Sequence, residues 1–390
     1  MRHGGTEKGR RGELDPNTEV EMNRAALSPR IASRRIIDWS KVRRVLVIRL
    51  RSIGDTVLAT PSLIALKKFL PDAQIDILLE DWVAPLLDGF DTVDNVLLVG
   101  KGSANRMRAA WRIRQRCYDV VFNLHGGTTA TFFAFASGAR HRVGYSEYQY
   151  NFLYNHLLSS SRDFWQRKVV HSAEQQLALL GFVAVPVEDK PKSSLSVTSA
   201  AMESLARKFP AIELRPQREE GLGEYALFHP AAAFATKTWA VENFARTAEF
   251  LLEKGIQTIA IAARNEAAIL ERLIAQANVP VKAFDDLSLP EITALASRAT
   301  LFVGNDSGIA HIAAAVNTPS VVIFGSSNRD HWRPWTGSAN EIVYEKFPCQ
   351  PCPGYECKEF GDPRCILTVR PRQVFDAIER VLGQNKKDGQ

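Results

Sequence analysis

The segment LFVGNDSGIAHIAAAVNTPSVVIFG, residues 301–325, decides the fold. Two apolar runs, at 301–303 and 320–324, flank a glycine-containing polar turn and a stretch with apolar residues at helical spacing. This pattern predicts a strand, a turn, a short helix and a second strand, which is the repeating unit of a parallel sheet. In such a unit the turn lies at the carboxyl end of the strand, where N–H groups at the helix start can bind an anion. The segment therefore predicts a site for a phosphate-bearing ligand.

The same alternation of strands and helices runs on both sides of a segment rich in Lys, Pro, Ser, Arg and Glu at 188–224. A chain of 390 residues is too long for one ordinary core. We therefore expect an α/β protein with two doubly wound, Rossmann-like domains that face a cleft. The expected parts are a flexible basic extension at 1–40, a first domain at 41–190, a connection at 191–224, a second domain at 225–370, and a C-terminal helix and tail at 371–390.

The composition is that of a globular protein, with 45% hydrophobic and 24% charged residues. A net charge of +6 allows an anionic partner, which would be a nucleic acid, an acidic lipid surface or a phosphorylated substrate; a generally basic protein is the alternative. Aromatic and basic residues do not interleave as in nucleic-acid-binding modules, so no nucleic acid is expected. No apolar run reaches the roughly 20 residues of a membrane span, and the Arg-rich start lacks the apolar core of a signal peptide. These features favour the cytoplasm.

Three segments together resemble the ADP-heptose:lipopolysaccharide heptosyltransferase family. They are VIRLRSIGDTVLATPSLIALKK, FHPAAAFATKTWAVENFARTAEFL and the opening segment, and the resemblance spans residues from about 43 to 382. It implies the GT-B architecture, with the acceptor on the first domain and the nucleotide sugar on the second. It also implies inverting transfer of heptose from ADP-heptose to an inner-core sugar of lipopolysaccharide, by an enzyme peripheral on the cytoplasmic face of the inner membrane.

Other functions are compatible with the same motifs. A related glycosyltransferase could use another nucleotide sugar, or an O-antigen or protein acceptor. A nucleotide-binding protein without transfer activity would share both domains.

Asp55 is the predicted catalytic base. Inverting transfer requires a base for the proton of the acceptor hydroxyl and a cationic or dipolar site for the departing diphosphate. Asp55 ends the turn Ser52-Ile53-Gly54-Asp55 after the first strand, where the family has its catalytic aspartate. A helix-capping aspartate is the alternative, and its replacement by Asn should leave activity largely intact. The helix after this turn is expected to have Thr60 as its N-cap and Pro61 in its first position.

Lys237 is predicted to bind the diphosphate as a point charge on a loop at a strand end, with Thr236 beside it as a hydroxyl donor. A solvated surface lysine is the alternative. Trp239 is expected to anchor this loop in the core.

The turn of the opening segment supplies the rest of the donor site. Gly308 permits close approach of the backbone, and amides at Ser307 and Gly308 can bind the diphosphate. Asp306 is expected to bind sugar hydroxyls, because a carboxylate beside a diphosphate is repulsive; the resemblance implies the same role. His311, about one helical turn further on, is either a donor-site residue or a packed core histidine.

Glu266 follows the strand expected at 258–263, where the family binds the adenosine ribose. The sequence Ala-Ala-Arg-Asn-Glu departs here from the Gly and acidic residues common in the family, and a first-turn carboxylate favoured by the helix dipole is the alternative. Arg51, Arg140 and Arg142 are predicted to bind an acidic acceptor, against the alternative of solvated arginines.

Four of the five cysteines lie in one window, Cys349, Cys352, Cys357 and Cys365. Their spacing suits a structural zinc or iron site, and free thiols or a disulfide are the alternatives. No Asp-x-Asp pair lies in a convincing loop, so we expect no cofactor in catalysis.

Overall fold

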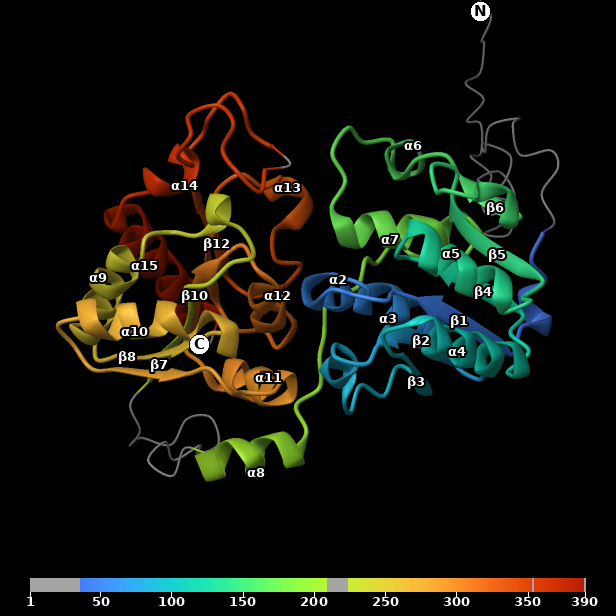
Figure 1. The fold of residues 1–390 in the computed structure, drawn as a ribbon, viewed down its shortest axis with the longest axis horizontal. Helices are drawn as coiled ribbons and strands as arrows, with labels where there is room; N and C mark the ends of the chain where they lie inside the picture. The colour runs from blue at the N-terminus through green and yellow to red at the C-terminus, as the bar shows by residue number, and fades with distance from the viewer. Residues whose placement is uncertain (1–35, 209–223, 353, 389–390) are drawn as a thin grey trace, which may run out of the picture. The chain divides into compact units, whose positions relative to one another are not determined.

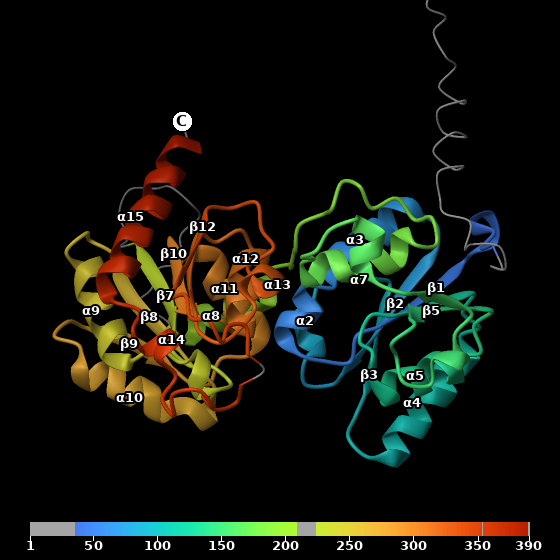
Figure 2. The same ribbon diagram turned by 90° about the horizontal axis from the view of Figure 1, so that it is seen from above.

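The computed structural model describes residues 36–208, 224–352 and 354–388. Its strands form two six-stranded sheets, and every strand pair in them is parallel. Helices cover both faces of each sheet (Figures 1 and 2). The expectation of an α/β protein with two doubly wound sheets is confirmed. The expected flexible extension at 1–40 lies almost entirely outside the described residues.

The first sheet has the strand order β3-β2-β1-β4-β5-β6. Its strands are β1 (Arg44–Ile48), β2 (Gln74–Glu80), β3 (Asn95–Val99), β4 (Val120–Asn123), β5 (His141–Tyr145) and β6 (His156–Leu158). Its helices are α2 (Ile53–Val57), α3 (Thr60–Phe69), α4 (Ser103–Gln115), α5 (Gly127–Ala136), α6 (Ser161–Trp165) and α7 (Ser172–Gly181).

The second sheet repeats this arrangement with the order β12-β11-β10-β7-β8-β9. Its strands are β7 (Tyr225–His229), β8 (Gln257–Ile261), β9 (Val281–Phe284), β10 (Leu301–Asn305), β11 (Ser320–Phe324) and β12 (Asn340–Tyr344). Its helices are α9 (Val241–Leu252), α10 (Ala267–Gln276), α11 (Leu289–Arg298), α12 (Gly308–Ala315), α13 (Arg329–Trp332), α14 (Arg364–Leu367) and α15 (Pro371–Asp388). Short 3-10 turns include η4 (Asn151–Leu153), η5 (Ala235–Lys237) and η6 (Arg264–Glu266).

Each sheet reverses its direction of strand addition once, between β1 and β4 in the first and between β7 and β10 in the second. At these points the loops after neighbouring strands diverge and leave a crevice at the carboxyl ends, where open α/β sheets bind ligands. The register pairs Ile48 with Asn123 in the first sheet and Gly304 with His229 in the second. The loops that follow β1 and β10 therefore begin at the two crevices.

The helix predicted to begin at Thr60 starts differently. The chain is already helical at α2, and the N-cap of α3 is Ala59, so the prediction of Thr60 as an N-cap was wrong. The Thr60 hydroxyl instead donates to the carbonyl of Val57 at 2.7 Å. Because α3 begins at Thr60, Pro61 is its second residue and not its first, although it still lies in the first turn. Asp55 thus belongs to a short helix of its own.

Helix α8 (Ser199–Lys208), which follows the first sheet in the chain, packs on α11 of the second. Ser204 and Lys208 both bond the Glu291 carboxylate, at 2.8 and 3.1 Å. Burial would raise the pKa of Glu291, but the bonds from Ser288, Ser204 and Lys208 outweigh it and lower the pKa to about 2. The connection between the sheets is therefore fixed to the second one by a charged group.

Within the described ranges, no helix is both long and apolar enough to cross a membrane.

Candidate active site

A pocket of about 620 Å³ lies between the start of α2 and the carboxyl end of the second sheet. A volume of roughly 300–1,000 Å³ is usual for small-molecule sites. Its polar side chains come from both halves of the chain: Ser52 and Asp55 from the start of α2, and His229, Lys237, Glu266, Asp306, Ser307 and His311 from the second half. The pocket therefore combines most of the predicted donor residues with the predicted base.

Asp55 lies in the first turn of α2, directly after the loop from β1. One carboxylate oxygen forms an ion pair with the guanidinium of Arg49, and the other accepts a bond from the Ser52 hydroxyl at 3.0 Å. The N-cap of α2 is Ser52, so Asp55 is not the capping residue. Arg49 also donates to the carbonyl of Leu124, the residue that follows β4. These contacts hold the Asp55 carboxylate at the crevice of the first sheet.

His125 lies beside this group, at the end of β4. Burial, together with the neighbouring Arg49 charge, lowers the pKa of His125 to about 4. The imidazole is therefore neutral at neutral pH.

Lys237 lies on η5, after β7, and its ammonium is 2.8 Å from the Asp306 carboxylate. Asp306 is buried and Lys237 is about three-quarters covered, so water screens this pair only in part. The interpretation of Lys237 as a solvated surface residue does not fit this position. The pair presents one cation and one anion to the same pocket.

Asn305 orders the loop that carries Lys237. Its side chain is fully buried, accepts the backbone N–H of Trp239 at 3.1 Å and donates to the carbonyl of Pro230 at 2.7 Å. Trp239 is also fully buried, and its indole N–H donates to Val369 at 2.8 Å. The expectation that Trp239 anchors this loop in the core is confirmed.

Gly308 and Gly54 let the start of α12 approach the start of α2 closely. A Cβ added at Gly308 would lie 2.8 Å from the Cβ of Ile53, and one added at Gly54 would lie 2.7 Å from the His311 ring. Both distances are shorter than van der Waals contact. The two glycines therefore bring the Asp55 turn next to the N–H groups at the start of α12.

Two histidines line the pocket in neutral form. Burial lowers the pKa of His229 to about 4, and its Nδ1 lies 3.0 Å from the Ser307 hydroxyl. Burial also lowers the pKa of His311, and its Nδ1 has no hydrogen-bond partner in the described part of the chain. His311 is thus packed in the core and lines the pocket as well. His229 was not among the predicted site residues, although the His-Pro pair at the end of β7 was the signal for it.

The structure does not bring every predicted site residue to this pocket. Thr236 is buried beside it, where its hydroxyl donates to Gly354 and accepts from Ser326. Arg51 is exposed near Glu80, Arg140 is exposed directly before β5, and Arg142 donates to backbone carbonyls.

Glu266 lines the pocket and also accepts the N–H of Ala263 at 3.2 Å, as a carboxylate does at a helix start. Apolar lining residues that the sequence did not single out are Phe234, Leu287, Leu289, Ile292 and Trp332. They come from three separate segments, so no single motif marks them.

The four clustered cysteines line one small cavity, separate from this pocket. All are free thiols, and burial with the nearby Cys352 raises the pKa of Cys365 to about 11. Among the residues that the structure describes, no group of three or more His, Cys, Asp or Glu side chains is arranged to hold a metal ion. The zinc or iron site stays a prediction.

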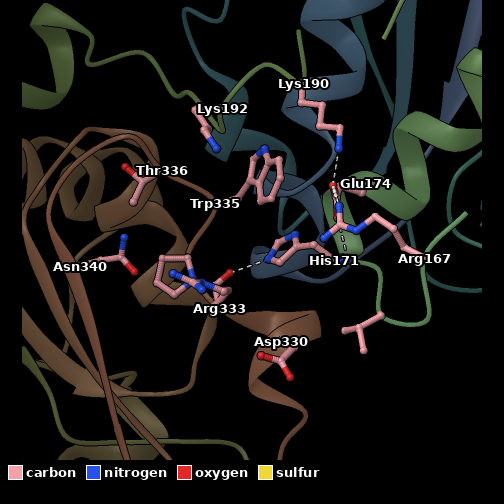
Figure 3. A pocket seen from close by; sticks show the side chains of 12 residues that line it. Arg167, His171, Glu174, Lys190, Lys192, Asp330, Arg333, Trp335, Thr336 and Asn340 are labelled. Atoms are coloured by element: carbon pink, nitrogen blue, oxygen red, sulfur yellow. Dashed lines mark hydrogen bonds and ion pairs between the residues drawn. The ribbon is translucent and has the colours of Figure 1, made fainter. Parts of the chain in front are cut away.

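A second cavity, of about 510 Å³, lies near α7 and α13 and is lined mainly by charged side chains (Figure 3). Trp335 is central to it and stacks on His171 on one side, with Lys192 over its ring at 4.1 Å. Glu174 pairs with both Arg167 and Lys190 at 2.7 Å (Figure 3). Its carboxylate is thus already satisfied. None of the residues predicted for the site from the sequence lines this cavity.

Two doubly wound sheets, with a carboxylate from one half and a lysine and helix start from the other, define a glycosyltransferase of the GT-B class. The comparisons with known proteins make this specific. Residues 106–361 match the model of glycosyltransferase family 9 (heptosyltransferase), and the chain belongs to this family.

Similar proteins agree with this assignment. The chain is 29% identical over 349 residues to lipopolysaccharide heptosyltransferase 3 of Escherichia coli, covering 85% of this chain and 97% of that protein. The structure of ADP-heptose lps heptosyltransferase II from E. coli superposes with a TM-score of 0.72, at 19% identity, over 88% of this chain and 99% of that one. The structure of E. coli heptosyltransferase WaaC with ADP superposes with a TM-score of 0.64, at 19% identity, over 86% of this chain and 99% of that one. The enzyme class and the GT-B fold are thereby confirmed.

Proposed function

We propose that this heptosyltransferase transfers heptose from ADP-heptose to an inner-core sugar of lipopolysaccharide, with inversion at the anomeric carbon. One observation carries the proposal: Asp55 and the Lys237–Asp306 pair line the same pocket, from opposite halves of the chain. Family membership and the ADP named for the similar WaaC structure support this donor.

In the proposed reaction the acceptor hydroxyl oxygen attacks the anomeric carbon of the heptose. The bond from that carbon to the β-phosphate oxygen breaks, and ADP leaves with the electron pair. The hydroxyl proton passes to the Asp55 carboxylate. Arg49 and Ser52 orient this carboxylate, so that it meets the acceptor at the crevice of the first sheet.

The leaving diphosphate gains charge as the bond breaks. We assign the stabilisation of that charge to the ammonium of Lys237 and the N–H groups at the start of α12, which line the same pocket. Asp306 would accept hydrogen bonds from heptose hydroxyls while it positions Lys237. In this proposal no metal cofactor takes part, and the chain acts at the cytoplasmic face of the inner membrane, where its acceptor is a membrane glycolipid.

Calorimetric titration with ADP, UDP and GDP tests the donor. We expect selective binding of ADP and at least tenfold weaker binding to Lys237→Ala, since a charge-assisted hydrogen bond is worth about 1.5–3 kcal/mol. Lys254→Ala is the matched control, because Lys254 also forms a carboxylate pair but lies just after the C-terminal end of α9, outside this pocket. Equal binding of all three nucleotides would reject the ADP assignment.

Transfer itself is tested with Asp55→Asn and ADP-heptose. The substitution keeps the shape of the side chain and removes the base, so we expect loss of at least a hundredfold in kcat with ADP affinity retained. Wild-type turnover by Asp55→Asn would remove Asp55 from the mechanism. Turnover of another nucleotide sugar in place of ADP-heptose would support the related-transferase alternative.

A further inference from the structure

Helices α4 and α5 lie side by side on one face of the first sheet (Figure 2). Their inner sides share one core cluster, with Ala110 and Ile113 from α4 and Phe133 and Ala134 from α5. The segment at 149–154 adjoins α5, because Tyr154 donates to the Thr131 hydroxyl at 3.0 Å. These three elements form one continuous surface.

The outer side of this surface is unusually apolar. Met107 and Trp111 are one helical turn apart on α4 and are 60% and 63% exposed. Phe132 and Phe135 are exposed on α5, and Tyr150 and Phe152 on the adjoining segment, with Phe152 at 76%. Single exposed apolar residues need no explanation, but six on neighbouring elements mark an interaction site. These six residues and four exposed arginines of α4 form one surface, which we name the α4–α5 face. The arginines are Arg106, Arg108, Arg112 and Arg114.

The charged side chains of this face are all positive. Helix α4 carries the exposed arginines Arg106, Arg108, Arg112 and Arg114, and neither α4 nor α5 contains an acidic residue. In the described part of the chain none of these four forms an ion pair; Arg108 donates to its neighbour Asn105. The arginines are therefore available to an anionic partner that also accepts aromatic side chains.

We propose that the α4–α5 face binds an anionic phospholipid surface. Exposed Trp and Phe beside these arginines suit the interfacial layer of a membrane, where the rings enter the headgroup region and the arginines meet lipid phosphates. A folded nucleic acid offers the anions but has no layer for these apolar side chains. A membrane accepts both kinds of side chain.

The face begins close to the candidate active site. Asn123, the last residue of β4, is in register with Ile48 of β1, and α5 begins four residues later. The Asp55 turn follows the same end of β1. A chain docked through this face would hold its first crevice near the lipid. This consequence, unlike the docking itself, rests on the proposed function, in which the acceptor is a glycolipid.

Co-sedimentation of the full chain with vesicles tests the docking. We compare phosphatidylglycerol–phosphatidylcholine vesicles with phosphatidylcholine alone and expect binding to the anionic vesicles. Trp111→Ala should weaken this binding about tenfold, and Arg112→Gln about fivefold, the factor that corresponds to about 1 kcal/mol per arginine at an anionic surface. Ile274→Ala and Arg246→Gln are matched controls, since both residues are exposed on helices of the second sheet. They should bind as the wild type does.

Three outcomes would overturn the proposal. They are binding of anionic vesicles that is equally strong in Trp111→Ala, tighter binding of duplex DNA than of vesicles, and a Trp111-dependent dimer in sedimentation that does not bind vesicles. Activity assays separate this proposal from the proposed function. Trp111→Ala should transfer normally to a lipid-free core saccharide and poorly to the same saccharide on a vesicle-embedded lipid. Absence of transfer to either acceptor in the wild type would count against the proposed function and leave the vesicle result intact.

Discussion

Gly54→Ala should slow sugar transfer without unfolding the chain. The new Cβ would lie 2.7 Å from Cδ2 of His311, whereas carbon atoms pack at about 3.5 Å or more, so the groups must separate by about 0.8 Å. The His311 ring is buried and cannot move freely into solvent. The adjustment therefore falls on α2, which carries Asp55.

The expected sizes follow from that separation. Overpacking costs about 1–3 kcal/mol, and alanine in a helix recovers about 1 kcal/mol relative to glycine, so the net loss of stability should be about 0–2 kcal/mol. Misplacement of a reacting group by about 1 Å can cost about a hundredfold in rate, so we expect kcat to fall by roughly 10- to 100-fold. Steady-state transfer from ADP-heptose and urea unfolding measure the two effects.

Gly383→Ala is the matched control. Gly383 lies in α15, and a Cβ there would meet no atom within 4 Å. The kcat of Gly383→Ala should therefore equal that of the wild type. A second test combines Gly54→Ala with His311→Ala, which removes the ring that the new methyl meets. The two fold losses of kcat in the single variants, multiplied together, give the loss expected for independent sites. The double variant should lose less kcat than this product. A wild-type rate in Gly54→Ala would refute the reasoning that close approach of α2 and α12 places the base.

Three further outcomes are expected. Burial lowers the pKa of His171 and His229 to about 4, below the value of about 6.5 in an unfolded chain, so protons bind preferentially to the unfolded state between these pH values. Stability should fall as pH drops from about 6.5 to 4, by up to about 1.4 kcal/mol per pH unit for each histidine, and urea unfolding with a flat pH dependence would contradict this. Lys237→Ala leaves the buried Asp306 carboxylate unpaired and should destabilise the chain by roughly 1–3 kcal/mol, whereas adding Asp306→Asn should recover part of that loss in thermal unfolding. For the cysteine window, one zinc or iron per chain in metal analysis would support the metal prediction, while five freely reacting thiols without bound metal would count against it.

Much of the fold could be predicted because apolar periodicity is strong in the buried strands. The two apolar runs of the opening segment, at 301–303 and 320–324, lie in β10 and β11, and β11 has the bounds of its run. Strands β5 and β6 were not predicted, because polar residues interrupt their apolar runs. His141 of β5 and His156 of β6 are buried, and Nδ1 of His141 lies 2.9 Å from Nε2 of His156. These polar residues can be buried because they pair with each other across 15 residues of sequence, which no local pattern predicts.

The candidate site was predictable only where a short motif carried it. Asp55, Lys237 and Asp306 each follow a strand in a recognisable turn, and they line one pocket. The ion pair of Lys237 with Asp306 joins residues that are 69 positions apart, so no local sequence pattern predicts it. Thr60 shows the opposite error: a residue with good capping chemistry donates to a carbonyl within an existing helical turn.

The two sheets have equivalent strand orders, each with its own reversal point. Under the proposed function, the reversal point of the first sheet serves the acceptor and that of the second sheet serves the donor. We would then expect substitutions in the loops after β1 and β4 to alter what is glycosylated, and those after β7 and β10 to alter which sugar nucleotide is consumed. Exchange of residues 41–190 between relatives would test this division of roles, since acceptor choice should change while the donor preference stays with the second half.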